Sequence, residues 1–331
     1  MQRKKLLGTA ACLGIALLAA GLLQASPADR IADLPTTVRF GNLPVIHDLP
    51  VYMAIEKGYF REAGIDVQLV SFQSPNQIVD ALLQHQVDIG GPSVALGIAG
   101  VANQKNPGKL KIYAIAGGNL EQPNDVLLVR TNSTITSIGD LRGKRLGILG
   151  GSIQWRTIAR HILEQNGLRM EDVAIIELAP GIQVQALASG QIDALLALEP
   201  IATVAKEQGA ATDLVREPAG TFISLPFYGG AGVVSTEFAS KHPETTENII
   251  RILERTVEEI EQDPEEAAAY LRGYTPLPDD VIANVPVIIF KVCEDITPED
   301  VRSINAFYDL FLRYGVVEEP IRFGDLAYCT G

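Results

Sequence analysis

The chain has 331 residues, of which 47% are hydrophobic and 20% are charged, a composition typical of a folded protein with room for two domains. Its formal net charge is −13 at pH 7, and the sequence carries no basic stripe. This acidic balance argues against nucleic acid and against anionic membrane surfaces as partners.

The N-terminus has the three-part pattern of a secretory signal. Basic residues 3–5 (RKK) precede an apolar stretch, residues 6–23, and small, turn-prone residues 24–27 (QASP) follow. The pattern predicts a signal peptide over residues 1–25, cleaved after Ala25. Because the apolar stretch approaches membrane-spanning length, an uncleaved anchor is the alternative. Loss of residues 1–25 leaves 24 Lys and Arg against 40 Asp and Glu, a net charge of −16.

Strands alternate with helices over residues 36–126, which we interpret as the first part of one lobe. The patterns occur in this order: a strand at 37–41, a helix at 50–60, a strand at 65–72, a helix from 75, a short strand at 87–89, a helix opened by 90–93, and a strand at 111–116. Strands that alternate with helices predict parallel sheets built from βαβ units.

One phrase of the sequence occurs twice. Residues 75–88 read PNQIVDALLQHQVD, and residues 180–193 read PGIQVQALASGQID, at a constant offset of 105. Each copy is typical of an amphipathic helix that leads into a short apolar strand. Two such units predict two similar lobes with a cleft between them.

A second lobe is predicted over residues 127–229, inserted into the first. It follows a strand at 125–130 and contains strands at 145–149 and 174–178, a helix at 154–165 and the second repeat copy. Residues 230–331 return to the first lobe and end in helices at 243–262, 264–271 and 298–314. The chain therefore crosses between the lobes twice, near 125–130 and 228–235. Two crossings predict a hinge that closes the lobes over a ligand.

Four passages resemble one protein family. They are LPVYMAIEKGYFREA (49–63), QVDIGGP (86–92), LRGKRLGILGGS (141–152) and GQIDALLALEP (190–200). They are similar to type II periplasmic binding proteins of the nitrate/taurine/aliphatic-sulfonate group of ABC importers. The resemblance implies a two-lobed α/β fold in which each lobe is a mixed, mostly parallel sheet flanked by helices. It also implies a monomeric periplasmic protein without cofactor, which captures a sulfonate, a taurine-like anion or nitrate and delivers it to an ABC permease at the inner membrane.

Ligands of open α/β sheets lie beyond the carboxyl ends of the strands, and this rule selects the candidate ligand residues. They are His47, Asp48, Ser74, Ser93, Asn119, Ser152, Trp155, Glu199 and Tyr228. Ser93 and Ser152 each follow glycines at a predicted helix start, where free N–H groups suit an anion. The alternative for each serine is an ordinary helix N-cap.

The other candidates also have structural alternatives. His47 and Asp48 lie in the first strand-to-helix loop, either as hydrogen-bonding groups or as a surface turn. Trp155 and Tyr228 are candidate cleft walls or core residues. Glu199 is placed to accept a ligand amine or to cap the helix that begins at Pro200.

The expected charge of the ligand is left open by the residues themselves. Arg156 is the only cation near the predicted cleft loops, so an uncharged, zwitterionic or pyrimidine-type ligand is an alternative to an anion. Asp88 and Asp193 hold equivalent repeat positions, and we interpret them as backbone-binding scaffold rather than as paired catalytic acids. No G-x-S-x-G or H-E-x-x-H motif occurs. We therefore predict a binding protein, with a same-fold enzyme for a small metabolite as the alternative.

The cysteines fit an exported protein. Cys12 lies in the predicted signal peptide, and Cys293 and Cys329 remain as an even pair in an oxidising compartment. A disulfide between them is predicted, against two free thiols as the alternative. No His or Cys at ligand spacing surrounds either residue, so no metal site is expected.

Overall fold

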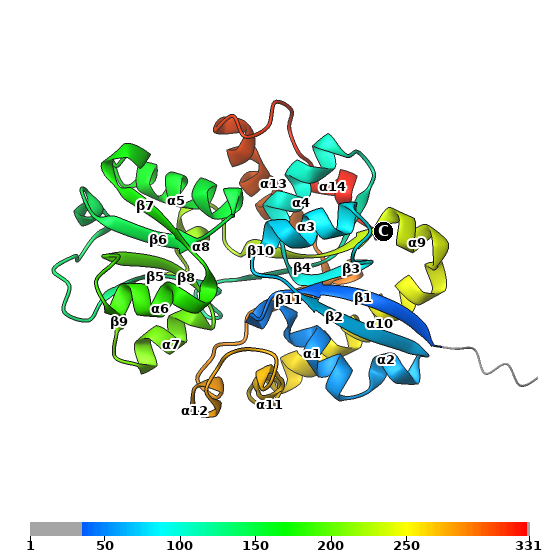
Figure 1. Ribbon diagram of the computed structural model, residues 1–331. Helices are drawn as coiled ribbons and strands as arrows, with labels where there is room; N and C mark the ends of the chain where they lie inside the picture. Colours follow the sequence, from blue (N-terminus) through cyan, green and yellow to red (C-terminus); the bar gives the residue numbers. More distant parts are fainter. Residues whose placement is uncertain (1–34, 330–331) are drawn as a thin grey trace, which may run out of the picture. The chain divides into compact units, whose positions relative to one another are not determined.

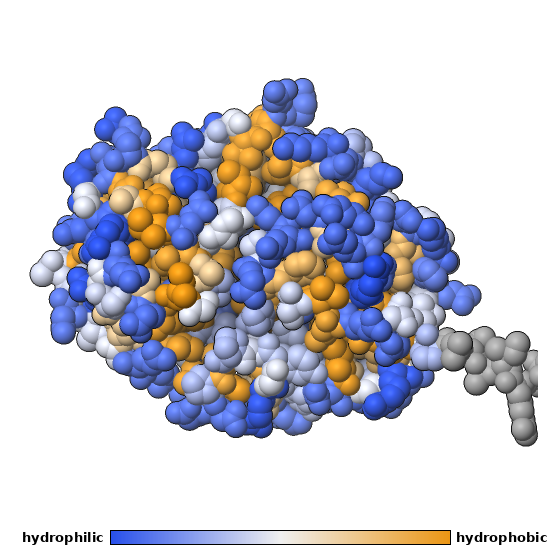
Figure 2. Space-filling model, in the orientation of Figure 1, coloured by the Kyte–Doolittle hydropathy of each residue, from blue (hydrophilic) through white to orange (hydrophobic). Residues whose placement is uncertain are grey.

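Two β-sheets, each covered by helices, make up residues 35–329, the part of the chain that the computed structural model describes (Figure 1). The predicted signal peptide, its cleavage site and the alternative N-terminal anchor lie outside the described residues. None of the described helices combines the length and the apolar character that crossing a membrane requires. Hydrophilic residues cover much of the face drawn in Figure 2, and apolar residues gather there in separate patches.

The first sheet has six strands in the order β11-β4-β10-β3-β1-β2. Strand β1 pairs in parallel with β2 and β3, whereas β10 is antiparallel to both β3 and β4. Every residue of β3 and of β10 is buried, as expected for strands covered on both faces. The strand bounds are β1 (Thr36–Asn42), β2 (Ile65–Ser71), β3 (Ile89–Ala95), β4 (Leu110–Gly118), β10 (Phe227–Ser235) and β11 (Ile289–Val292).

The second sheet has five strands in the order β7-β6-β8-β5-β9. Strand β6 pairs in parallel with β7 and β8, and β5 is antiparallel to β8 and β9. The bounds are β5 (Asp125–Arg130), β6 (Arg145–Leu149), β7 (Ala174–Leu178), β8 (Ala194–Leu198) and β9 (Ala211–Arg216). The chain passes between the sheets twice, after β4 and before β10.

Many helices begin at a proline, because proline lacks the N–H that the first helical turn leaves unpaired. This holds for α3 (Pro75–Leu83), α6 (Pro180–Ala188), α8 (Pro218–Phe222), α10 (Pro243–Gln262), α11 (Pro264–Ala268) and α13 (Pro298–Arg313). The other helices are α1 (Leu49–Glu56), α2 (Tyr59–Glu62), α4 (Leu96–Lys105), α5 (Ile153–Gln165), α7 (Ile201–Glu207), α9 (Thr236–Lys241), α12 (Asp279–Ile282) and α14 (Phe323–Leu326).

Three local predictions need correction. The helix predicted over 50–60 is divided into α1 and α2 at Gly58, whose φ of 77° favours glycine. Residues 90–93 do not open a helix: they belong to β3, and α4 begins only at Leu96. The short elements β9, α8 and β11 were not predicted at all.

The repeated phrase forms the same structure in both copies, α3 before β3 and α6 before β8. A positive-φ residue follows the helix of each copy two residues after its end, His85 in the first and Gly190 in the second. Asp88 then accepts two hydrogen bonds from Arg39, one from its backbone N–H at 2.9 Å and one from its guanidinium at 2.6 Å. Asp193 accepts the equivalent bonds from Arg145 at 2.9 and 2.8 Å. Both aspartates are therefore scaffold residues, as predicted.

A disulfide joins Cys293 to Cys329, with 5.3 Å between the Cα atoms, and this is the pairing that the sequence predicts. Cys293 follows β11 directly, and Cys329 lies near the end of the chain. The bond therefore fastens the C-terminal segment to the first sheet.

Candidate functional site

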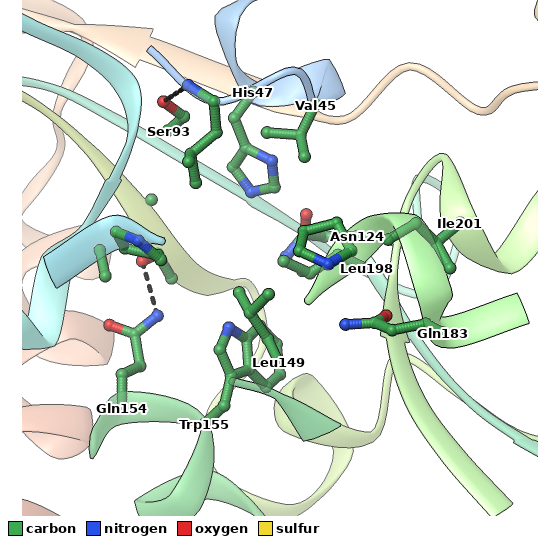
Figure 3. A pocket seen from close by; sticks show the side chains of 16 residues that line it. Val45, His47, Ser93, Asn124, Leu149, Gln154, Trp155, Gln183, Leu198 and Ile201 are labelled. Atoms are coloured by element: carbon green, nitrogen blue, oxygen red, sulfur yellow. Dashed lines mark hydrogen bonds between the residues drawn. The ribbon is translucent and has the colours of Figure 1, made fainter. Parts of the chain in front are cut away.

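A small cavity of about 30 Å³ lies where residues from both sheets meet. Its wall is contributed by the loop after β1, by β3 and β10, by the segment before β5, and by the carboxyl ends of β6 and β8 with the helices α5, α6 and α7. Figure 3 shows the labelled side chains around this space. The lining residues are Leu43, Val45, His47, Pro75, Ser93, Ala95, Asn124, Leu149, Gln154, Trp155, Pro180, Gln183, Leu198, Ile201, Gly229 and Gly230.

None of the described residues that line this cavity is a lysine, an arginine or an acid. The polar side chains among them are those of His47, Ser93, Asn124, Gln154, Trp155 and Gln183. Arg156, the one cation predicted near the cleft, instead pairs with Glu177 at 2.9 Å and is 47% exposed. The cavity is therefore polar at a few points but contains no fixed cation.

His47 lies in a turn of 3-10 helix, Ile46–Asp48, and its ring projects toward the cavity (Figure 3). Burial lowers its pKa to about 4, so the imidazole is neutral at pH 7. Its Nδ1 atom is buried without a hydrogen-bond partner among the described residues. Gly230 packs closely against it, because a Cβ there would lie 2.7 Å from the His47 Cδ2 atom.

Asp48 lies behind the wall and holds two of its segments together. Its carboxylate accepts the N–H of Ser93 at 3.0 Å and the N–H of Leu43 at 3.1 Å, and the Ser93 hydroxyl oxygen also accepts the latter at 3.1 Å. Burial raises the pKa of Asp48 to about 7. A Cβ on Gly91 would overlap this carboxylate. Gly91 thus makes room for Asp48, whereas the sequence suggested that the glycines let a ligand approach the backbone.

Asn124 is fully buried immediately before β5, and the chain holds its backbone at both ends. Its N–H donates to a Glu217 carboxylate oxygen at 2.7 Å, and its carbonyl oxygen accepts the N–H of Glu199 at 2.9 Å. In contrast, neither side-chain atom, Oδ1 or Nδ2, has a hydrogen-bond partner among the described residues. A buried amide without hydrogen-bond partners costs free energy, and this identifies the Asn124 side chain as a candidate ligand-binding group.

The two glutamines of the wall are already bonded. The Gln154 side chain accepts the N–H of Gly97 at 2.8 Å. It also donates to the carbonyl oxygen of Gly229 at 2.9 Å (Figure 3), so it ties α5 to both α4 and β10. The Gln183 amide nitrogen donates to the Leu178 carbonyl oxygen at 3.2 Å. Gln154 therefore couples the second sheet's helices to the first sheet.

A pair of buried acids, Asp125 and Glu217, lies next to Asn124. Asp125 accepts the N–H of Ala219 at 3.1 Å, while one oxygen of each acid has no partner among the described residues. Burial raises the pKa of both carboxyls, and the charge of Asp125 raises that of Glu217 further. No described His, Cys, Asp and Glu residues form a group of three that could hold a metal ion.

Besides Asp48, five of the predicted ligand residues do not line the cavity. Ser74 caps α3 through a capping box, and Ser152 caps α5 by accepting the Trp155 N–H at 3.4 Å. Asn119 lies in a turn, where its side chain accepts two backbone N–H groups. Glu199 is buried and accepts the first-turn N–H of Thr203 at 3.0 Å. The Tyr228 hydroxyl donates to Asp300 at 2.6 Å.

Of the remaining predictions, His47, Ser93 and Trp155 line the cavity, and Asp48 supports it from behind. Sequence reasoning missed Asn124, Gln154 and Gln183. Gln183 follows the strand predicted at 174–178. The sequence pattern therefore indicated its position near the cleft but not the role of its amide. Asn124 precedes a strand, and no local signal identifies it.

The sequence matches one family model and several known proteins. The model of the NMT1/THI5-like family matches residues 47–267. A Bacillus subtilis (strain 168) protein named for binding aliphatic sulfonates is 26% identical over 285 residues, 84% of this chain and 82% of that protein. A 4-amino-5-hydroxymethyl-2-methylpyrimidine phosphate synthase of Saccharomyces cerevisiae is 21% identical over 235 residues, 68% of this chain and 66% of that enzyme.

A solved structure shows the same fold. The alkanesulfonate-binding protein of Xanthomonas axonopodis pv. citri, bound to MOPS, superposes with a TM-score of 0.72 at 20% identity, over 90% of this chain and all of that one. The predicted two-sheet α/β fold of periplasmic binding proteins is therefore confirmed.

Proposed function

Since this chain belongs to the NMT1/THI5-like family, we propose that it is the substrate-binding component of an ABC importer. It captures a small solute in the cavity between its two sheets and delivers it to a permease at the inner membrane. The predicted signal peptide exports it to the periplasm, and the names of the sulfonate-binding relatives support this class of function.

The observation that carries the proposal is the make-up of the cavity wall. Both sheets contribute to it, and the chain passes between them at only two places in the described residues, directly before β5 and before β10. Motion about these two connections opens and closes the wall around a solute. Asn124 lies at one connection, and Gly229 lies just inside β10 after the other. Closure therefore brings the lining residues of the two sheets together around the solute.

A second candidate function is a same-fold enzyme, favoured by the similarity to the yeast synthase. An enzyme of that kind needs a proton-transfer or nucleophilic group at the ligand. Among the described residues that line the cavity, the groups of this type are the imidazole of His47 and the hydroxyl of Ser93. The Ser93 hydroxyl oxygen already accepts the N–H of Leu43 at 3.1 Å, and no acid, cysteine or lysine lines the wall with them. Binding without turnover is therefore the better-supported function.

Trp155, the chain's single tryptophan, lines the cavity and provides the test. We expect its fluorescence to change saturably as small periplasmic solutes are titrated, and the bound solute to be recovered chemically unchanged. Recovery of a converted product would support the enzyme instead. Spectra that stay constant for every solute bound in calorimetry would contradict the cavity as the binding site.

A further inference from the structure

We propose that the cavity selects an uncharged solute that presents an amide-like edge, a hydrogen-bond donor beside an acceptor, to the side chain of Asn124. This inference rests on the proposed function and names the class of solute. It separates this chain from relatives named for sulfonates, because a sulfonate carries a fixed negative charge and accepts hydrogen bonds without donating any.

Charge is the first argument. A buried anion needs a cation or several free N–H donors, because its desolvation costs several kcal/mol otherwise. No described lysine or arginine lines the cavity, and His47 is neutral. The ionisable side chains that bond to the wall are carboxyls instead of cations: that of Asp48 accepts the N–H of Ser93, and that of Glu217 accepts the N–H of Asn124.

The helix N-termini at the cavity, which are the usual alternative to a cation, each have fewer free N–H groups than an uncapped helix start. Ser152 accepts the N–H of Trp155 in the first turn of α5. The carboxylate of Glu199 accepts the N–H of Thr203 in the first turn of α7. Helix α6 begins at Pro180, which has no N–H to offer. The three helix starts of the second sheet that meet the cavity are therefore poorly suited to an anion.

The unpaired groups of the wall are the second argument. The buried side chain of Asn124 leaves one donor atom and one acceptor atom without partners, and His47 Nδ1 adds a third. An anion that accepts from the Asn124 nitrogen leaves the Asn124 oxygen unsatisfied. An amide-like edge pairs with both atoms at once, and this holds whichever way round the side-chain amide is placed.

The rest of the wall suits a compact, uncharged molecule once the two sheets move apart, because the cavity of about 30 Å³ has room for only about one water as it stands. Leu43, Val45, Leu149 and Leu198 surround the polar groups, and the Trp155 side chain closes one side (Figure 3). An apolar wall with a few fixed polar points is the usual design of a small-molecule site. A larger open groove continues outward from Val45, Pro180 and Ile201, which line both spaces.

Calorimetry with matched pairs tests the inference on the purified wild-type protein. The probes are acetamide and acetate, nicotinamide and nicotinate, and benzenesulfonamide and benzenesulfonate, with taurine and nitrate as further anions. We expect the uncharged member of at least one pair to bind at least tenfold more tightly than its anion. Tighter binding of the anions, or of taurine or nitrate, overturns the inference and leaves the proposed function standing. Failure of every probe, together with a protein that co-purifies with no solute, overturns both.

Two variants locate the effect. Asn124→Leu removes the donor and the acceptor while it keeps the branched shape and the number of heavy atoms of the side chain, and we expect at least a tenfold loss of affinity for the uncharged probe that binds best. Asn106→Leu is the matched control on the exposed end of α4 and keeps wild-type affinity. Unchanged affinity in Asn124→Leu would contradict the assignment. The wild-type comparison of matched pairs decides the charge class even where a variant does not fold.

Discussion

The backbone N–H of Glu199 donates to the carbonyl oxygen of Asn124 at 2.9 Å, and this bond continues the β5–β8 pairing to the cavity wall. It fixes the main chain of Asn124 while the side chain of the same residue has no partner among the described residues. The fold therefore positions a buried amide rigidly and leaves its hydrogen-bonding capacity unused. Such an arrangement lowers stability in exchange for a prepared ligand group.

The unpaired side chain of Asn124 should lower the stability of the ligand-free protein. Asn124→Leu should raise the free energy of unfolding of the ligand-free protein by about 1 kcal/mol, because two buried unpaired polar atoms are replaced by apolar ones. Urea denaturation measures the change. Asn106→Leu on the surface removes one exposed hydrogen bond to the carbonyl oxygen of Ala102 and should lower the free energy of unfolding by no more than about 1 kcal/mol. A clear loss of stability in Asn124→Leu would show that the side chain has a structural role instead.

The duplicated aspartates should matter for stability and not for binding. Asp193→Ala removes an acceptor of three hydrogen bonds from Arg145 and should lower the free energy of unfolding by about 1–3 kcal/mol. Asp279→Ala breaks an exposed ion pair with Arg272 and should cost less than about 0.5 kcal/mol. Solute affinity should be unchanged in both variants. A large loss of affinity in Asp193→Ala alone would return this residue to the binding site.

The acid pair Asp125 and Glu217 predicts a pH dependence of stability. Burial raises the pKa of the Glu217 carboxyl, and the Asp125 charge raises it further, so the folded protein retains a proton that the unfolded chain has released. The contribution of this group to stability therefore falls as the pH rises from 5 to 9. Glu217→Gln removes the titrating group. Its free energy of unfolding, relative to that of wild type, should therefore rise by more than about 1 kcal/mol between pH 5 and pH 9.

Denaturation at pH 5, 7 and 9 provides the measurement for that pair. Glu265→Gln, an exposed change elsewhere in the chain, serves as the control and should follow the wild-type profile. Comparison between variants is necessary because the pKa of His47 is lowered by burial to about 4, and this has the opposite effect. Below about pH 6.5, its contribution to stability falls as the pH falls. The same pH dependence of the free energy of unfolding in wild type and in Glu217→Gln would contradict the raised pKa of Glu217.

The disulfide should stabilise the fold without affecting the cavity. Cys329→Ser opens a loop of 36 residues and should lower the free energy of unfolding by about 3–4 kcal/mol on the loop-entropy estimate. Neither cysteine lines the cavity, so solute affinity should remain the same in the folded variant. Reduction of the wild-type protein should reproduce the loss of stability. A variant as stable as wild type would contradict this role.

The sequence predicted those features that depend on local periodicity. The two helix–strand copies, the scaffold role of Asp88 and Asp193, and the helices that begin at proline, except α8, all follow from patterns within a few residues. The cavity depends instead on residues far apart in sequence. Asn124 is held by Glu217, which lies 93 residues further along the chain. No periodic pattern reports such a contact.

The glycines before Ser93 show the same limit. Their neighbours suggested a helix start with free N–H groups for an anion, but the strand β3 continues through them. The reason is the Asp48 carboxylate, which comes from 45 residues earlier, occupies the space beside Gly91 and accepts the Ser93 N–H. Glycine spacing shows where the backbone can adopt several conformations. The contact with a side chain distant in sequence determines which of them it adopts.

The most direct test of the central claim is native mass spectrometry of the protein purified from the cells that make it, followed by denaturation to release the bound molecule. We predict one small uncharged solute per chain, released unchanged from wild type and from Asn106→Leu, and absent from folded Asn124→Leu. A co-purified solute that remains on Asn124→Leu, or a bound molecule that the protein converts, would contradict capture at this cavity.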